Sequence, residues 1–292
     1  MTSVLEKNFK LYGYSDDDTE YLLDVYKKIM SDKESSAIWQ EAIELYYSDV
    51  SCDFSKIIDA ADRVARLLYL KEYTTEWLIF FCLIPKAKEY YKERGISEDI
   101  FHETMMDMRY KLEEGKLVKG VRGFFASVWF NGFFGLERFA LGRLQYEIIP
   151  FGKYAKECYG DLTLDTKVIN VHIPRSGTPL SPESVDESLA MAKEFFKKEL
   201  GENPTFICVS WLLDPQNERL FPEKSNMYKF LKRFTIIQSG TYKENTNLWR
   251  LFDTDEQNPD RLPTDSSVRR AYVEHLKNGG KTGWGFGIIR YS

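Results

Sequence analysis

The chain has 292 residues, enough for one large domain or two of ordinary size. Its 43% hydrophobic and 29% charged residues are typical of a globular protein and exclude a disordered or fibrous one. The net charge of −5, with Lys and Arg scattered among acidic residues, argues against a nucleic-acid partner, because such proteins carry a basic stripe. The longest apolar run, residues 77–85, is too short for a membrane span, and the N-terminal stretch lacks the apolar core of a signal peptide. We therefore expect a soluble cytoplasmic protein with no membrane partner.

Nothing in the sequence indicates a metal site. The four cysteines are widely spaced, with no CxxC pair and no Cys/His cluster, and neither an HExxH nor an EF-hand pattern occurs. The cysteines are expected to be free thiols, and no metal is expected as a cofactor.

Glycine and proline divide the chain into two parts. Only two of the 18 glycines and one of the ten prolines occur in the first 114 residues. Both residue types mark the turns between short elements, so their scarcity predicts long helices and their abundance predicts strands and loops. We expect a helical domain over residues 1–130 and a second domain over residues 131–292.

The first part shows five apolar stripes at helical spacing, over residues 21–29, 38–46, 57–68, 77–84 and 100–108. Ser15 is a suitable N-cap for the first of these helices, and Asp18 stands at its third position, where a carboxylate favours the helix dipole. Ser97 can start the fifth helix, and Pro85 is expected to kink or end the fourth. The stripes carry no clustered His, Cys or carboxylate set, so they are interpreted as the core between helices.

The second part alternates between strands and helices. Strands are predicted at residues 144–149, 168–174, 205–214, 234–243 and 284–288. Helices are predicted between them at residues 181–200, 222–231 and 266–277. The glycines among residues 279–287 are expected to allow tight packing of the last strand. This alternation predicts an α/β domain with at least one parallel crossover, and therefore an α+β chain.

The loop after the strand at residues 168–174 is the most informative feature. Ser181 is a good N-cap and Pro182 a good first residue for the helix that follows. Backbone N–H groups at such a helix start favour an anion, Gly177 permits close backbone approach, and Arg175 adds a cation. The loop therefore suits a phosphate or pyrophosphate, although no GxGxxG or Walker pattern is present. The alternative is that these residues only turn the chain and cap the helix.

A resemblance to a known family is carried by four stretches: NVHIPRSGTPLSPESVDESLAMAKEFF, FICVSWLLDP, PEKSNMYKFLKRFTII and FGLERFALGRLQYEI. They resemble a family of bacterial acyltransferase-domain proteins. In that family an all-helical N-acyltransferase N-terminal domain precedes a domain similar to the Gcn5-related N-acetyltransferases (GNAT). The resemblance implies a GNAT-like mixed α/β acyl-CoA N-acyltransferase domain after the helical one. It also implies acetyl-CoA or another acyl-CoA as co-substrate, and a small-molecule amine as acceptor.

The family pattern assigns roles to particular residues. The pyrophosphate loop would be formed by Arg175, Ser176, Gly177 and Ser181. Asn226 would hold the pantetheine arm of coenzyme A. The loop sequence R-S-G-T-P-L-S departs from the usual Q/R-x-x-G-x-G/A. The tyrosine that often acts as general acid has no aligned counterpart, because Tyr228 is nearby but out of phase.

Two further side chains are catalytic candidates. Asn170 and His172 share one face of their strand, and a histidine there can take a proton from an ammonium nucleophile. The alternative is a histidine that is hydrogen-bonded inside the sheet. Ser210, on the neighbouring strand, can orient the thioester carbonyl or satisfy local backbone groups. No GxSxG elbow supports Ser210 as a nucleophile.

Three functions are compatible with these residues. The first is transfer of an acyl group from coenzyme A to an unidentified amine, with His172 as base. The second is a ligand-binding or scaffold protein that keeps the fold without turnover, which the altered loop favours. The third, a hydrolase that uses Ser210, is disfavoured by the local sequence.

Overall fold

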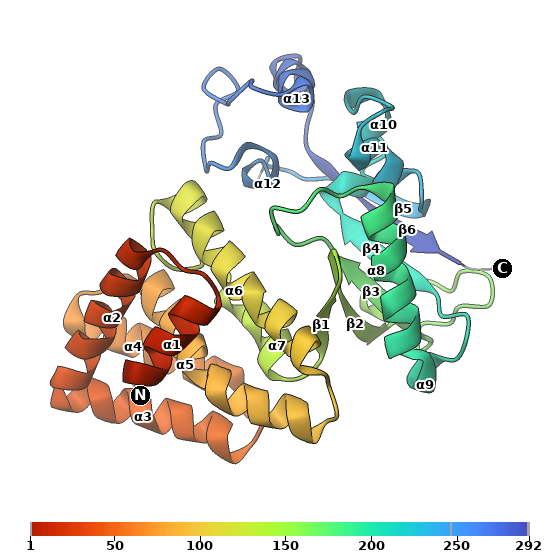
Figure 1. The fold of residues 1–292 in the computed structure, drawn as a ribbon. Helices are drawn as coiled ribbons and strands as arrows, with labels where there is room; N and C mark the ends of the chain where they lie inside the picture. Colours follow the sequence, from red (N-terminus) through yellow and green to blue (C-terminus); the bar gives the residue numbers. More distant parts are fainter. Residues whose placement is uncertain (1, 246, 291–292) are drawn as a thin grey trace. The chain divides into compact units, whose positions relative to one another are not determined.

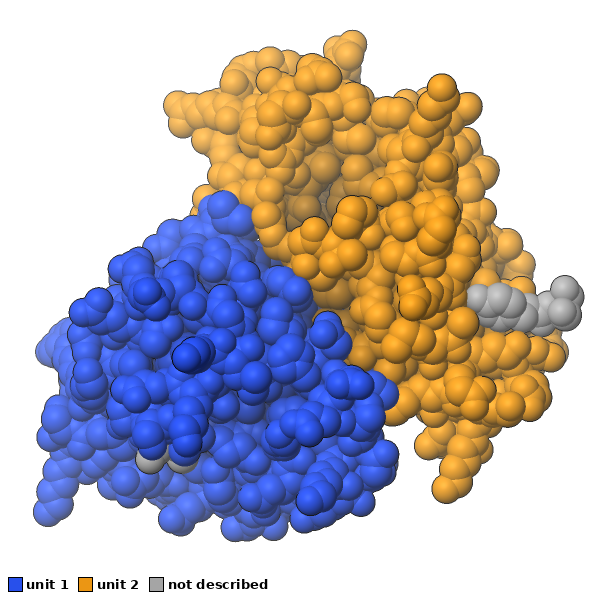
Figure 2. Space-filling model, in the orientation of Figure 1, with its two compact units in different colours: residues 1–139 blue, residues 140–292 orange. Residues whose placement is uncertain are grey.

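The computed structural model of the protein describes residues 2–245 and 247–290. The chain divides into two compact units, residues 1–139 and residues 140–292, which Figure 2 shows in different colours. Helices form the first unit, and a mixed sheet with helices forms the second. The predicted fold class, a helical region followed by a mixed α/β domain, is therefore confirmed.

The first unit contains long helices with short connections (Figure 1). They are α1 (Thr2–Leu11), α2 (Asp16–Ser31), α3 (Lys33–Ser48), α4 (Phe54–Leu68), α5 (Glu72–Glu93) and α6 (Glu98–Lys119), followed by the 3-10 turn η1 (Ser127–Phe130) and the short α7 (Asn131–Phe134). The apolar run of α5 is fully enclosed, from Trp77 to Ile84. Pro85 lies inside α5 and does not end it, although its missing N–H removes one helical hydrogen bond. Ser97 caps α6 as predicted.

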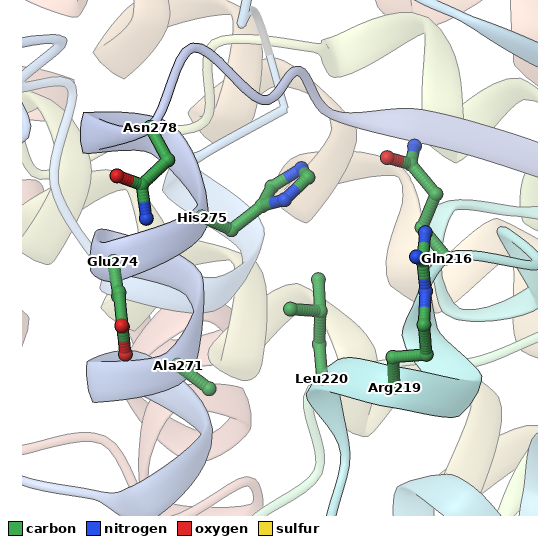
Figure 3. A pocket seen from close by; sticks show the side chains of 7 residues that line it. All are labelled: Gln216, Arg219, Leu220, Ala271, Glu274, His275 and Asn278. Atoms are coloured by element: carbon green, nitrogen blue, oxygen red, sulfur yellow. The ribbon is translucent and has the colours of Figure 1, made fainter.

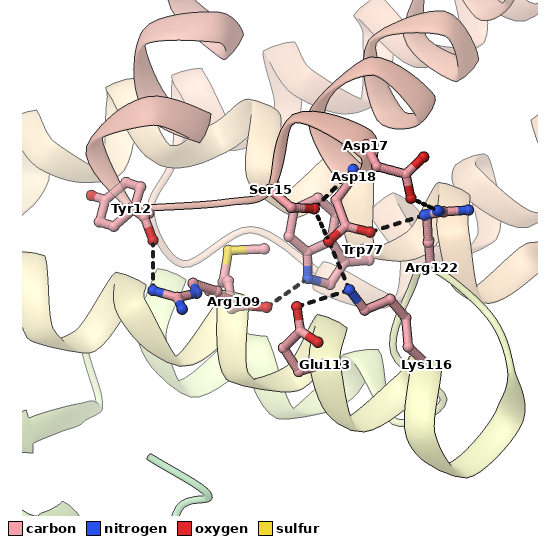
Figure 4. A network of polar contacts seen from close by, with 10 residues as sticks. Tyr12, Ser15, Asp17, Asp18, Trp77, Arg109, Glu113, Lys116 and Arg122 are labelled. Carbon is pink, nitrogen blue, oxygen red and sulfur yellow. Dashed lines mark hydrogen bonds and ion pairs between the residues drawn. The ribbon is translucent and has the colours of Figure 1, made fainter. Parts of the chain in front are cut away.

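A buried carboxylate anchors the start of α2 (Figure 4). Ser15 caps the helix as predicted, and its hydroxyl donates to Asp18 at 2.7 Å. Asp18 is only 1% exposed, and it accepts from Lys116 at 2.7 Å and from Arg122 at 2.9 Å. Burial by itself would raise the pKa of Asp18, but these hydrogen bonds hold it below its ordinary value. The charge of Asp18 therefore ties α2 to the end of α6.

Replacing Asp18 with asparagine is expected to lower the free energy of unfolding by about 2 kcal/mol at neutral pH, because two cations lose their charged acceptor. The folded-state pKa of Asp18 is depressed, so its contribution is present above the unfolded value of 3.8 and is lost as pH falls through the folded value. Urea unfolding at pH 7 and at pH 3 should show the difference from wild type shrinking in acid. Asp17→Asn is the control, since the exposed Asp17 also pairs with Arg122 but should cost less than about 0.5 kcal/mol. Equal costs for the two variants would contradict the role of burial.

The sheet has the strand order β1-β2-β3-β4-β6-β5 and, apart from residues 138 and 139, lies in the second unit. Its strands are β1 (Arg138–Leu141), β2 (Leu144–Pro150), β3 (Lys167–His172), β4 (Phe206–Ser210), β5 (Thr235–Thr241) and β6 (Gly283–Ile289). β3 and β4 are parallel, joined by α8 (Pro182–Phe195) and α9 (Lys197–Leu200), which is the predicted crossover. β6 lies between β4 and β5 and is antiparallel to both. The remaining helical pieces are η2 (Phe151–Lys153), η3 (Trp211–Leu213), α10 (Asn217–Leu220), α11 (Asn226–Leu231), α12 (Trp249–Phe252) and α13 (Ser267–Lys277).

The two faces of the sheet are covered differently. α8 lies against one face (Figure 1), where the buried Ser188 hydroxyl accepts from the N–H of Leu144 at 3.0 Å and contacts the hydroxyl of Tyr146 at 2.8 Å. The other face carries an apolar cluster that includes Ile149, Val168, Ile207, Phe286 and Ile288. Because side chains alternate along a strand, Glu147, Asn170 and His172 belong to this second face.

The strand predicted over residues 205–214 was wrong in its second half. β4 ends at Ser210, and residues Trp211–Leu213 form the 3-10 turn η3. This turn packs against Gly285 and Gly287 of β6. A Cβ on Gly285 would meet the Leu213 carbonyl oxygen at 1.9 Å. The predicted tight packing of these glycines is thus confirmed. The helix predicted over residues 222–231 is also shorter than expected, since α11 begins at Asn226.

Candidate active site

The carboxyl ends of the two parallel strands separate. Within the described residues, β3 and β4 are paired at only two positions, the last being Asn170 with Ile207. On its other side β3 stays paired with β2 as far as His172, and β4 stays paired with β6 as far as Ser210. Beyond Asn170 and Ile207, the edges of β3 and β4 that face each other thus carry backbone N–H and C=O groups that take no part in the β3–β4 pairing. An extended ligand can pair with such groups.

The loop after β3, residues 173–181, leads to the same end of the sheet. Ser181 caps α8 by accepting from the N–H of Ser184 at 3.2 Å, and Pro182 is the first helical residue, as predicted. Gly177 has φ +70°, and a Cβ added there would have no atom within 4 Å. The loop therefore combines a left-handed turn with open space, beside a helix start whose N–H groups favour an anion.

Backbone contacts fix the shape of this loop. The Arg143 guanidinium donates to the carbonyl oxygens of Pro174 at 3.0 Å and Thr178 at 2.9 Å. The Ser176 hydroxyl accepts from the N–H of Thr178 at 3.4 Å. Ser176 thus helps to shape the turn in which the sequence predicted a phosphate contact.

Arg175, the cation predicted for the loop, is ion-paired. Its guanidinium contacts Asp253, which follows α12. Asp253 also accepts from Arg269 at 2.7 Å, and Arg269 pairs with Asp265 at 3.0 Å. A phosphate that binds Arg175 has to displace the Asp253 carboxylate or share the Arg175 guanidinium with it.

His172 lies in a cluster of polar side chains on the face opposite α8. Its Nε2 is 3.0 Å from Oε1 of Glu147 and 3.1 Å from Nδ2 of Asn170. The Asn170 amide donates to the same Glu147 oxygen at 3.0 Å, and Nζ of Lys153 is 4.0 Å from it. The His172 side chain keeps 16% of its surface exposed, whereas the Glu147 side chain keeps 6%. The histidine therefore lies at the edge of the strand opening and contacts a carboxylate that is more deeply buried than the imidazole.

Ser210 is not brought together with His172. The β3–β4 register places Asn170 and Ile207 on one face, so Ser210, three residues after Ile207, lies on the other face. The Ser210 hydroxyl accepts from the N–H of Leu212 at 3.2 Å and caps η3. This is the local backbone role that the sequence left open as an alternative.

Asn226 and Tyr228 both lie on α11. Ser225 caps this helix by accepting from the N–H of Tyr228 at 3.1 Å, so Asn226 is the first helical residue. Arg233, just after α11, donates to the Pro182 carbonyl oxygen at 2.9 Å. The helix is thereby fastened beside the first turn of α8, where the predicted pyrophosphate loop ends.

A separate polar hollow of about 350 Å³ lies between α10 and α13, whose side chains face each other across it (Figure 3). It is lined by Gln216, Arg219, Leu220, Ala271, Glu274, His275 and Asn278, and by none of the predicted site residues. Among the described residues, no group of three or more His, Cys, Asp or Glu side chains could hold a metal ion. In the same part of the chain, no helix combines the length and apolar character needed to cross a bilayer.

Glu147 and Asp253 were not predicted from the sequence, and Arg143, which the sequence suggests as a partner for a carboxylate, binds the carbonyl oxygens of the loop. A signal for Glu147 was present, since it is the single acidic residue in the otherwise uncharged stretch of residues 144–151. Its pairing with His172 follows from the antiparallel register of β2 and β3, which no local pattern specifies. Asp253 acts through contacts distant in sequence and had no local signal.

The strand order, the parallel β3–α8–β4 unit and the separated strand ends define the second unit as a GNAT-like α/β domain. Residues 139–289 match the family described as GNAT-like C-terminal domain, and residues 5–136 match the N-acyltransferase N-terminal domain. The chain belongs to the family of proteins with a GNAT-like C-terminal domain, which confirms the resemblance found in the sequence.

Solved structures with the same fold are acyltransferases. One, in complex with decanoyl-CoA and teicoplanin, has a TM-score of 0.75 and 21% sequence identity over 98% of this chain and 87% of that chain. Another, a mutant acyltransferase in complex with octanoyl-CoA, has the same TM-score and identity over 99% of this chain and 88% of that one. At this identity the likeness shows the fold. No curated protein matches the sequence.

Proposed function

We propose that the protein is an acyl-CoA-dependent N-acyltransferase, which moves an acyl group from a coenzyme A thioester to an amine. The observation that carries this proposal is the opening between β3 and β4, which ends beside His172 and at the same sheet edge as the loop containing Gly177. An opening between strands suits the extended pantetheine arm, and the helix start suits its pyrophosphate. The acyl-CoA ligands held by similar acyltransferases support the same use of this fold.

The proposed reaction is direct attack of the amine on the thioester carbonyl. A C–N bond forms, the C–S bond breaks, and coenzyme A leaves as a thiolate that takes up a proton. His172 accepts one proton from the ammonium group of the acceptor, which frees the nitrogen lone pair for attack, because its imidazole lies at the end of the strand opening. The nitrogen loses a second proton when the C–S bond breaks, which balances the proton taken up by the thiolate. The fixed strands supply orientation of the two reactants.

The remaining predicted residues are assigned to the donor. The pyrophosphate is bound by the loop residues Arg175, Ser176, Gly177 and Ser181, together with the first N–H groups of α8. Asn226 contacts the pantetheine arm from α11, and Tyr228 of the same helix protonates the leaving thiolate. Ser210 is given no role in the reaction, because its hydroxyl caps η3 and lies on the face opposite His172.

The donor and acceptor classes follow from the similar structures. Decanoyl-CoA and octanoyl-CoA in those complexes favour a medium-chain acyl-CoA as donor, in addition to acetyl-CoA. Teicoplanin in one of them favours an amine carried on a larger, glycosylated scaffold over a protein side chain. An acceptor screen should therefore include amino sugars and glycopeptides.

A second candidate is a ligand-binding protein without turnover. The observation that favours it is the ion pair between Arg175 and Asp253, which engages the loop cation with a protein carboxylate. Such a protein would bind coenzyme A and release no thiol in the presence of any amine.

Calorimetric titration with acetyl-CoA and decanoyl-CoA tests the proposed donor site. We expect micromolar binding of at least one of them, weakened roughly tenfold or more by Gly177→Val, since the added side chain enters the open space beside the loop. Gly201→Val is the matched control, because Gly201 also has a positive φ, +78°, and open space around it but follows α9. Valine is strained at the backbone conformation of Gly201 as well (φ +78°, ψ −167°), and this variant should leave the affinity unchanged. Absence of heat and of thermal stabilisation with both compounds would remove the coenzyme A assignment.

A further inference from the structure

Glu147 is a carboxyl group built into the middle of a sheet. It is 5% exposed and stands between Tyr146 and Ile148 on β2. Burying a carboxylate is unfavourable unless hydrogen bonds and charges compensate it. Asn170 and His172 both contact a single Glu147 oxygen, each at 3.0 Å. A buried acid held in this way points to a role that an apolar residue could not fill.

Rigid backbone fixes the contact between Glu147 and His172. In the antiparallel register of β2 and β3, Glu147 stands opposite Asn170, and Gln145 stands opposite His172. Glu147 and His172 are therefore diagonal neighbours on the same face, a separation that long side chains span. Both residues of this contact lie on paired strands, and neither lies on a loop.

The hydrogen-bond chemistry favours one tautomer of His172. A carboxylate only accepts, and the amide nitrogen of Asn170 only donates. If Nε2 of His172 were bare, it would accept from the Asn170 amide at 3.1 Å, but it would also face the Glu147 oxygen, a second acceptor, at 3.0 Å. If Nε2 carries the proton, it donates to the charged Glu147 oxygen, which is the stronger bond, while the Asn170 amide keeps its own bond to that oxygen and lies beside Nε2 as a second donor at 3.1 Å. Nδ1 is then the nitrogen that carries the lone pair.

We propose that Glu147 is a positioning residue for His172: it holds the neutral imidazole with its proton on Nε2, presents Nδ1 as the base, and stabilises the imidazolium that forms. The inference rests on the proposed acyl transfer for its functional meaning. In the reaction, the proton leaves the ammonium nitrogen of the acceptor and binds Nδ1 of His172. Glu147 stays ionised throughout, with Lys153 at 4.0 Å as a further cation beside it.

The test combines imidazole nitrogen NMR with kinetics on the full chain. In the wild type, the nitrogen shifts of His172 should show a protonated Nε2 and an unprotonated Nδ1 at a pH where the ring is neutral. Glu147→Ala should shift this pattern toward a tautomer mixture. Glu147→Gln, which keeps the shape without the charge, should lower kcat roughly tenfold and leave KM for acyl-CoA unchanged. Asp214→Asn is the matched control, since Asp214 is another buried acid of the same unit, 3% exposed, with Gln216 as its partner; it should change neither readout.

The outcomes separate this inference from the proposed function. If His172→Ala abolishes turnover but Glu147→Gln keeps wild-type kcat and Glu147→Ala keeps the wild-type nitrogen pattern, Glu147 does not position His172. If the wild type shows the proton on Nδ1, the tautomer assignment is wrong whatever the activity. If no amine is acylated, the acyl-transfer proposal fails, while the NMR pattern still reports on the contact between Glu147 and His172. Thermal unfolding of each variant checks that it is folded.

Discussion

Replacement of His172 by alanine is expected to reduce turnover by about 10²–10⁴-fold and to leave the affinity for acyl-CoA unchanged. The imidazole is the base that we assign to the end of the strand opening. The alanine variant loses it, and the Glu147 carboxylate behind it is only 6% exposed and therefore a poor substitute. Donor affinity should be preserved, because the loop at residues 173–181 and the first turn of α8 are left intact. Release of the coenzyme A thiol gives the rate, and calorimetry gives the affinity.

A second histidine in the same unit supplies the control. His275, on α13, contacts the carbonyl oxygen of Lys281 at 3.2 Å and lines the hollow of Figure 3. His275→Ala should therefore keep its turnover. Two results would count against His172 as base: more than half of wild-type turnover in His172→Ala, or a loss of turnover fully explained by lost acyl-CoA affinity. Partial recovery of His172→Ala by added imidazole would strengthen the assignment.

Local chemistry made the caps and the crossover predictable. Ser15, Ser97 and Ser181 each precede an amphipathic stretch and each accepts from a first-turn N–H in the structure. The strand–loop–helix unit around Pro182 was readable for the same reason, because its signals lie within a few residues of one another. The family resemblance then supplied the GNAT-like arrangement that these elements adopt.

Contacts between distant residues were not predictable from local patterns. Arg175 and Asp253 are 78 residues apart, and their ion pair depends on where α12 lies. His172 was recognised as a candidate, but its partner Glu147 comes from another strand and becomes a neighbour only through the β2–β3 register. The early end of β4 was not predictable in the same way: the sequence 205–214 favours a strand, but residues 211–213 turn and pack against Gly285 of β6, which lies far away in the chain.

Replacement of Gly285 by alanine is expected to destabilise the second unit by about 3 kcal/mol or more. A Cβ at this position would lie 1.9 Å from the Leu213 carbonyl oxygen and 2.6 Å from its carbonyl carbon, far inside contact distance. These are backbone atoms of η3, so relief requires moving the turn or the strand. Gly285 is also paired with Ser210, the last residue of β4, so the strain falls at the end of the strand opening.

A second glycine of the same sheet gives the matched control. At Gly240, on β5, the nearest atoms to an added Cβ belong to the Trp284 side chain, at 3.0 Å, which can shift. Gly240→Ala should therefore cost about 1 kcal/mol or less. Denaturant unfolding gives the free energies, and hydrogen exchange of the β6 amides assigns the loss to the sheet, because a chain of two units can unfold in more than one step. Equal stability of the two variants would mean that η3 yields easily, and the end of β4 would then be set by its own sequence and not by β6.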